Sequence, residues 1–203
     1  IAGCVLWLDA SDVDGDSNTN NNPSGGTTIF EWGDRSGQGH DADNSHGAPT
    51  YVANALNGHP VVHFTAAPKD HLYTTYNFDS LSQYTVMAVA RYNGANAGGR
   101  VISSKTRNWL FGFHYGEKQQ FYAEGWIYDG NISAGTNWYL HTATMTDDSN
   151  PKASFWEGGT LLTSDNTSSS DTIYKPGQIG MGGSIRDSSQ YSDCDVAELV
   201  IFD

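Results

Sequence analysis

The chain has 203 residues, of which 23 are Gly, 12% are aromatic and 16% are charged, and its formal net charge is −13. This length suits one domain, and the composition favours many strands joined by tight turns over a helical protein. An acidic chain without Lys/Arg clusters argues against nucleic acid and anionic membrane surfaces as partners, and no apolar run approaches the about 20 residues that span a bilayer.

The chain begins at Ile1 without a Met or a signal peptide and enters an apolar strand at once. We therefore expect residues 1–203 to be a single domain excised from a longer chain, with covalently linked neighbouring domains in the parent protein.

Short segments with strand composition recur along the whole chain, separated by turn signals such as Asn93-Gly94 and Gly158-Gly159. They are Gly3–Leu8, Ile29–Trp32, Pro60–Phe64, Tyr84–Tyr92, Arg100–Ser104, Trp109–His114, Gln120–Tyr128, Trp138–Met145, Ala153–Trp156, Gln178–Met181 and Val196–Phe202. Tyr84–Tyr92 is apolar on both faces, which predicts a central strand. No segment has a helical stripe, so the sequence predicts an all-β fold, a two-sheet antiparallel β-sandwich.

An acidic loop follows the first strand: Asp12-Val13-Asp14-Gly15-Asp16-Ser17-Asn18, with Asp9 just upstream. Oxygen ligands at alternate positions, with a Gly that allows a tight bend, can wrap a hard cation. We therefore name Asp9, Asp12, Asp14, Asp16 and Asn18 as candidate Ca²⁺ ligands. The alternative is a solvated turn rich in Asp and Asn, which is common.

The two cysteines, Cys4 and Cys194, lie in or beside the first and last predicted strands. If these strands pair antiparallel, the sulfurs can meet in a disulfide, which would imply an oxidising compartment. The alternative is two buried free thiols.

Aromatic residues alternate with polar ones in the predicted strand around residues 119–128. Strand periodicity places Tyr122, Glu124, Trp126 and Tyr128 on one face, and residues suited to a core on the other. Flat rings beside a carboxylate suit a surface that stacks on sugar rings and hydrogen-bonds their hydroxyls. The alternative is that these rings fill a second layer of core.

Catalytic signatures are sparse. Glycosidases need two carboxylates about 5–10 Å apart, and the nearest approach, Asp193-Cys194-Asp195-Val196-Ala197-Glu198, has the wrong spacing for one strand face. We therefore expect no enzymatic activity.

Four motifs occur in an order that carries a family resemblance. They are Val5-Leu6-Trp7-Leu8-Asp9-Ala10-Ser11-Asp12, Glu31-Trp32-Gly33-Asp34-Arg35-Ser36-Gly37, residues 56–64 and residues 196–202. Together they resemble the concanavalin A-like, laminin-G-like jelly-roll domains of large secreted bacterial proteins. The chain departs from that pattern at Thr65 and Ala66, where such domains usually carry Asp and Gly.

The resemblance implies a sugar-binding or adhesion module, often appended to a glycan-active enzyme and often with calcium in its loops. We expect a non-catalytic carbohydrate-binding module that recognises a polysaccharide, secreted or on the cell surface. The predicted binding residues are Trp126, Tyr128, Tyr122 and Glu124, with His114, Arg107 and Trp109 near one rim. The alternatives are a calcium-stiffened adhesion or spacer domain and a glycan-active lyase or glycosidase.

Overall fold

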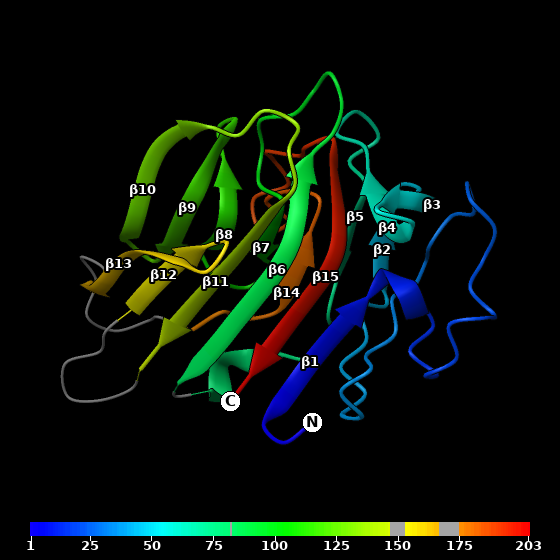
Figure 1. Cartoon of the computed structure of the whole chain (residues 1–203), viewed down its shortest axis with the longest axis horizontal. Coiled ribbons are helices and arrows are strands. Elements are labelled where there is room, and N and C mark those ends of the chain that lie inside the picture. Colours follow the sequence, from blue (N-terminus) through cyan, green and yellow to red (C-terminus); the bar gives the residue numbers. More distant parts are fainter. Residues whose placement is uncertain (82, 147–152, 167–174) are drawn as a thin grey trace.

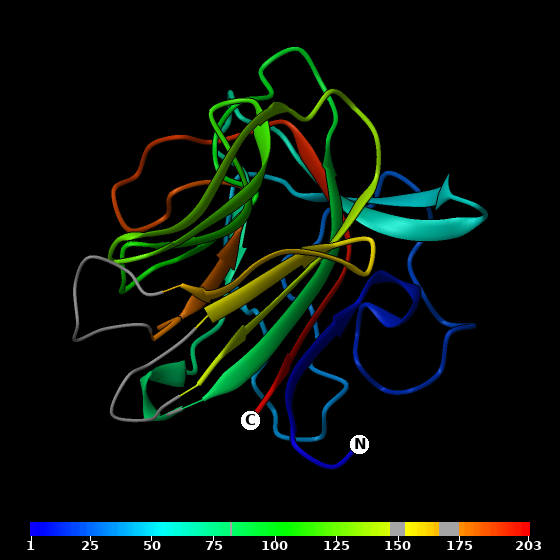
Figure 2. The ribbon, with the colours of Figure 1, turned by 60° about the vertical axis from the view of Figure 1, so that its left-hand side comes forward.

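Two antiparallel sheets lie face to face in the computed structural model, which describes residues 1–81, 83–146, 153–166 and 175–203 (Figures 1 and 2). The larger sheet runs in the order β13 (Thr160–Asn166), β12 (Ala153–Glu157), β11 (Tyr139–Met145), β6 (Tyr84–Tyr92), β15 (Cys194–Phe202), β4 (His59–Phe64) and β3 (Thr50–Leu56). β1 (Cys4–Asp9) also pairs with β15. The predicted all-β sandwich is confirmed.

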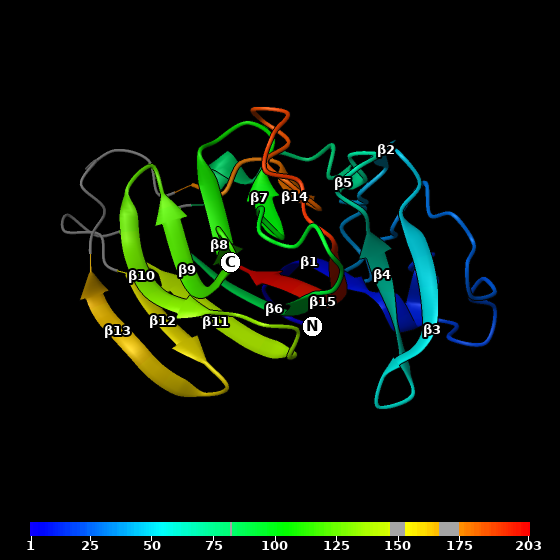
Figure 3. The ribbon, with the colours of Figure 1, turned by 90° about the horizontal axis from the view of Figure 1, so that it is seen from above.

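The smaller sheet runs in the order β10 (Trp126–Ser133), β9 (Glu117–Ala123), β8 (Trp109–His114), β7 (Ile102–Ser104), β14 (Ile179–Met181), β5 (His71–Tyr73) and β2 (Asn44–His46). Viewed from above, its strands lie over those of the larger sheet (Figure 3). The helices of the described residues are two three-residue 3₁₀ turns, η1 (Ala10–Asp12) and η2 (Phe78–Ser80). Neither has the length or apolar character to cross a lipid bilayer.

The core fills the space between the sheets. β6 lies between β11 and β15, as its two apolar faces predict, and it buries Val86 and Ala88 inward. Opposite them, the rings of Phe111 and Phe121 meet edge to face, with centroids 6.0 Å apart, and Phe155 of β12 closes on Phe111 at 5.8 Å. Interlocked rings of this kind add to the apolar burial that holds the sheets together.

The predicted strand Gln120–Tyr128 is wrong, because the chain reverses within it. β9 ends at Ala123 and β10 begins at Trp126, with Glu124 in the left-handed region at φ 55°. The Ala123 amide donates to the Gly125 carbonyl at 2.9 Å and closes the turn. Tyr122 and Trp126 therefore become cross-strand partners in a hairpin.

The predicted disulfide is also wrong. β1 and β15 do pair antiparallel, but the register sets Cys4 opposite Phe202 and sets Cys194 opposite Phe64. Eight residues of extended strand, about 26 Å, separate the two cysteine positions, whereas a disulfide needs Cα atoms within about 7 Å. Both are buried free thiols.

Candidate functional site

Aromatic rings gather on the outer face of the smaller sheet, where β8, β9 and β10 adjoin. The Trp126 patch, as we call it, consists of His114, Tyr115, Tyr122 and Trp126. The Trp126 ring centroid lies 5.2 Å from that of Tyr122 and 5.9 Å from that of His114, which in turn lies 3.9 Å from Tyr115. Trp126 is 41% exposed and Tyr115 is 70% exposed. Two open rings thus flank a less accessible centre.

Three polar side chains, those of Arg100, Gln190 and His114, lie next to these rings, and we call them the polar floor of the patch. The Arg100 guanidinium is buried and donates from Nε to Gln190 Oε1 at 2.7 Å, and Gln190 Nε2 lies 3.4 Å from the Tyr115 hydroxyl. Nε2 of His114 is buried without a direct hydrogen-bond partner among the described residues. Burial, and then the charge of Arg100, lower the pKa of His114, while the Gln190 side chain opposes them. A neutral imidazole offers one donor and one acceptor, as a sugar hydroxyl does.

The structure brings together three of the residues predicted for sugar binding, Trp126, Tyr122 and His114, and separates the others. Trp109 is wrong as a contact residue, because it faces the core at 0% exposure and donates from Nε1 to the Tyr84 hydroxyl. Tyr128 is half-buried against the core, with its ring centroid 5.9 Å from that of Phe155.

The remaining predicted residues hold the chain locally. Glu124 accepts the Asn108 amide at 2.9 Å and so fixes the hairpin turn. Arg107 pairs with Asp79 at 2.6 Å, and this contact raises the pKa of the guanidinium. Sequence reasoning missed Tyr115, Arg100 and Gln190. Tyr115 directly follows a predicted strand, which is a usable signal, whereas Gln190 comes from a segment with no strand pattern.

The outer face of the larger sheet is a second open surface. Half-buried Trp7 and Trp156 lie on it, and Glu198 accepts a hydrogen bond from Trp7 Nε1 at 2.8 Å. A bulge between Val196 and Glu198 shifts the register, which places Asp195 and Glu198 on this same face.

The carboxylate of Asp195 on that face has a structural role, because it accepts three side-chain hydrogen bonds. It is 1% exposed and bonds to His63 Nδ1 at 2.6 Å, Arg91 Nε at 2.8 Å and Asn93 Nδ2 at 2.9 Å. The hydrogen bond to Asp195 raises the pKa of His63 despite its burial. The network ties β4, β6 and β15 together.

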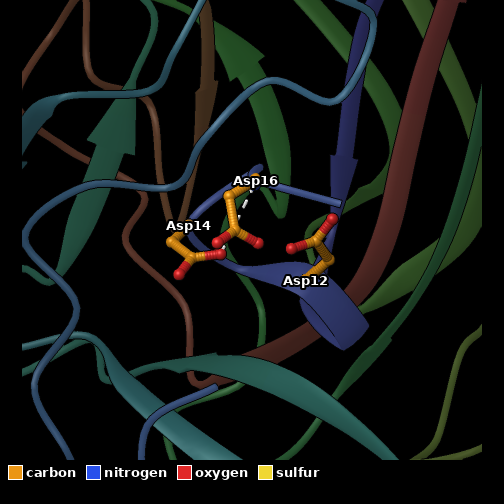
Figure 4. Close-up of side chains that lie close together, drawn as sticks. All are labelled: Asp12, Asp14 and Asp16. Atoms are coloured by element: carbon orange, nitrogen blue, oxygen red, sulfur yellow. Dashed lines mark hydrogen bonds between the residues drawn. The ribbon is translucent and has the colours of Figure 1, made fainter. Parts of the chain in front are cut away.

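The acidic loop brings Asp12, Asp14 and Asp16 together, as its spacing predicts (Figure 4). Asp9 lies outside this group: its carboxylate caps the Ser11 amide at 2.8 Å and pairs with Arg35. Asn18 accepts the Asn20 amide at 3.3 Å, so its side-chain oxygen serves the loop backbone. Burial raises the pKa of Asp12, and the Arg35 charge opposes that effect.

Similarity to known proteins is confined to the fold. No family model matches the chain, and no curated protein matches it. Domain 4 of AbnA, a GH43 extracellular arabinanase from Geobacillus stearothermophilus solved with arabinotriose, matches at 13% identity with a TM-score of 0.61, over 98% of this chain and 92% of that one.

Two further structures share the sandwich. The binding domain of botulinum neurotoxin DC, solved with SialylT, matches 98% of this chain with a TM-score of 0.57 and 14% identity. A sialidase of Trypanosoma rangeli matches 99% of it at 0.55 and 12% identity. The chain spans 47% of the first structure and 31% of the second. At these identities, all three establish the two-sheet sandwich and leave the ligand open.

Proposed function

We propose that the chain is a non-catalytic module that binds a polysaccharide at the Trp126 patch, within a secreted or cell-surface protein. The observation that carries this proposal is the pair of exposed rings, Trp126 and Tyr115, which both adjoin the ring of buried His114, with buried Arg100 and half-buried Gln190 nearby. The rings supply flat apolar faces, and the floor supplies directional donors and acceptors.

Both parts suit the chemistry of a pyranose or furanose ring. Its C–H face packs on an aromatic ring, while its hydroxyls need partners at the edge. The net charge of −13 repels sulfated and uronic acid polymers, so we expect a neutral glycan. A site of a few rings and hydrogen bonds gives affinities from micromolar to millimolar, which suits a module that relies on avidity.

The comparisons support the proposal through the ligands of the similar structures. The arabinanase domain was solved with an arabinotriose, and the neurotoxin binding domain with SialylT. Attachment to a glycan-active enzyme or an adhesin would fit such a role, and linked domains would supply the avidity.

Affinity gel electrophoresis against arabinan, xylan, mixed-linkage glucan and a sialylated glycoprotein tests the proposal. We expect at least one neutral polysaccharide to retard the protein and Trp126→Ala to lose about tenfold or more in affinity, because a stacked ring contributes about 0.5–1.5 kcal/mol beyond its area. Trp156→Ala is the matched control, since Trp156 is a half-buried tryptophan of the larger sheet. Loss of retention in Trp156→Ala but not in Trp126→Ala would move the site to that sheet.

Glycan hydrolysis is the second candidate function, because the bulge sets Asp195 and Glu198 on one face of the larger sheet. Asp195 already bonds to three side chains and is buried, which leaves it poorly placed for proton transfer to a substrate. Release of reducing ends from the same panel of polysaccharides, abolished in Glu198→Gln, would favour the enzyme. A blank panel for both binding and hydrolysis would leave an adhesion or spacer domain.

A further inference from the structure

Three carboxylates converge in the loop after η1, and they differ sharply in burial. Asp12 is 0% exposed, while Asp14 and Asp16 are open to solvent. One oxygen of each lies within 4.8 Å of the others. Because Ca²⁺–O distances are about 2.4 Å, two oxygens on opposite sides of one ion lie about 4.8 Å apart. Three oxygens this close come within reach of a single calcium ion once the exposed Asp14 and Asp16 side chains turn slightly.

The buried carboxylate is only partly satisfied. Asp12 Oδ2 accepts the Ser17 amide at 2.9 Å and lies 2.8 Å from Arg35 Nε. Asp12 Oδ1 is buried and has no hydrogen-bond partner among the described residues. An unpaired carboxylate oxygen in the interior is costly, and a bound cation removes that cost. Figure 4 shows the Asp12 carboxylate facing the side of the loop that carries Asp14 and Asp16.

The local charge is also uncompensated. Arg35 forms ion pairs with Asp9 and Asp12, whereas the ion pairs of the described residues include no cation for Asp14 or Asp16. Asp9, Asp12, Asp14 and Asp16 together with Arg35 carry a formal charge of −3, and Asp12 is fully buried. Close carboxylates either share a proton or bind a cation.

The loop is held in place by close backbone packing, so the carboxylates are prepositioned. The Gly33 amide donates to the Val13 carbonyl at 2.8 Å, and the Gly15 amide donates to the Asp12 carbonyl at 3.1 Å. A Cβ at Gly33 would lie 2.4 Å from the Asp14 carbonyl oxygen, so only glycine fits there. Arg35 lies two residues after Gly33, so this close packing also holds the Arg35 guanidinium next to the acidic loop.

We infer that Asp12, Asp14 and Asp16 bind one Ca²⁺ ion that links the acidic loop to the Gly33–Arg35 segment. The three ligands are all carboxylates, which argues against zinc, because zinc prefers His and Cys ligands. Because Asp14 and Asp16 are exposed, water can complete the coordination shell, which suits the variable coordination of Ca²⁺ better than the strict octahedron of Mg²⁺. This site is independent of the proposed sugar-binding patch.

Calorimetric titration of chelator-treated protein with CaCl₂ and, in parallel, with MgCl₂ tests the inference. We expect one Ca²⁺ per chain with a Kd of about 10⁻⁵ to 10⁻³ M, and weaker binding of Mg²⁺. At a Ca²⁺ concentration 100 times the Kd, the Tm should rise by about 5–10 °C. Asp14→Asn should weaken Ca²⁺ binding by at least tenfold and remove most of the Tm shift, since Asp14 is exposed and its loss leaves the Asp12–Arg35 pair in place.

Asp43→Asn is the matched control, because Asp43 is an exposed carboxylate of a different loop. It should bind Ca²⁺ as the wild type does. Absence of any Ca²⁺-dependent heat or Tm shift in the wild type would overturn the inference, as would equal losses in Asp14→Asn and Asp43→Asn, or equal affinity for Mg²⁺. Asp16→Asn provides a second exposed variant if Asp14→Asn fails to fold. None of these outcomes bears on polysaccharide retention, which is measured separately.

Discussion

Glu157 forms a polar link between the two sheets, and its loss should destabilise the protein in a pH-dependent way. Its carboxylate lies on β12 of the larger sheet and accepts from Lys118 Nζ at 2.5 Å and Gln119 Nε2 at 3.1 Å, both on β9 of the smaller sheet. Nε2 of buried His141 lies 3.2 Å from its other oxygen. The His141 contact, followed by those of Lys118 and Gln119, lowers the pKa of Glu157 from 4.5 to about 2, against the effect of burial.

The sign and size of the effect on stability follow from the difference between the unfolded and folded pKa values of Glu157. A carboxyl group whose pKa is lower in the folded state stabilises the fold above its unfolded pKa, and this stabilisation is lost as the pH falls through the folded pKa. The difference corresponds to about 3 kcal/mol, and partial solvent screening reduces it to about 2 kcal/mol. Glu157→Gln should therefore lower the free energy of unfolding by about 2 kcal/mol at pH 7, with the deficit shrinking between pH 4.5 and 2.

Urea unfolding followed by tryptophan fluorescence at several pH values measures this deficit directly. Glu31→Gln is the control, because Glu31 is exposed and should leave the stability nearly unchanged at every pH. A Glu157→Gln deficit that stayed constant from pH 7 to pH 2.5 would falsify the electrostatic explanation. Such a result would mean that the carboxylate acts through packing alone.

Two further predictions concern Trp109 and the thiols. Trp109→Phe should lower the free energy of unfolding by about 1–3 kcal/mol, because it removes buried volume and the bond to Tyr84, yet it should leave polysaccharide retention intact. Urea titration and the affinity gel measure the two effects, and loss of retention in the folded variant would contradict the core position of Trp109. Dithiothreitol should leave the Tm unchanged, and thiol titration after denaturation should find both Cys4 and Cys194 reduced. A Tm that fell on reduction would contradict the observed register.

The fold was predictable from the sequence because alternating burial and turn residues act locally. Tyr84–Tyr92 has the predicted bounds and lies between β11 and β15, as predicted from its two apolar faces; its inward residues are buried and its outward residues are half-buried. The predicted strand Ile29–Trp32 instead makes one isolated bridge, from Trp32 to Ala42, and the preceding residue Thr28 makes another, to Thr50. Trp32 is apolar and buried in the core, but burial by itself does not imply that a residue pairs in a strand.

The candidate site was only partly predictable, because face assignments along a strand fail wherever the chain turns or bulges. The spacing of Asp195 and Glu198 predicts opposite faces of a regular strand, yet a bulge sets both on the same face. The opposite happened at Tyr128: the register shift after Trp126 turns that ring toward the core. The local sequence predicts neither of these two register shifts, because each depends on how the strand pairs with its neighbour.

Trp126 and Tyr122 share a face for a different reason from the one predicted. On one continuous strand, four residues would separate them by about 13 Å. In the hairpin they are cross-strand partners, and their ring centroids lie 5.2 Å apart. The turn at Glu124 therefore converts an extended row of rings into a compact cluster, which Tyr115 and His114 complete from β8 and the residue that follows it. In the proposed binding mode these rings supply the stacking surface, and the Arg100–Gln190 pair, which reaches the Tyr115 hydroxyl, supplies the directional hydrogen bonds.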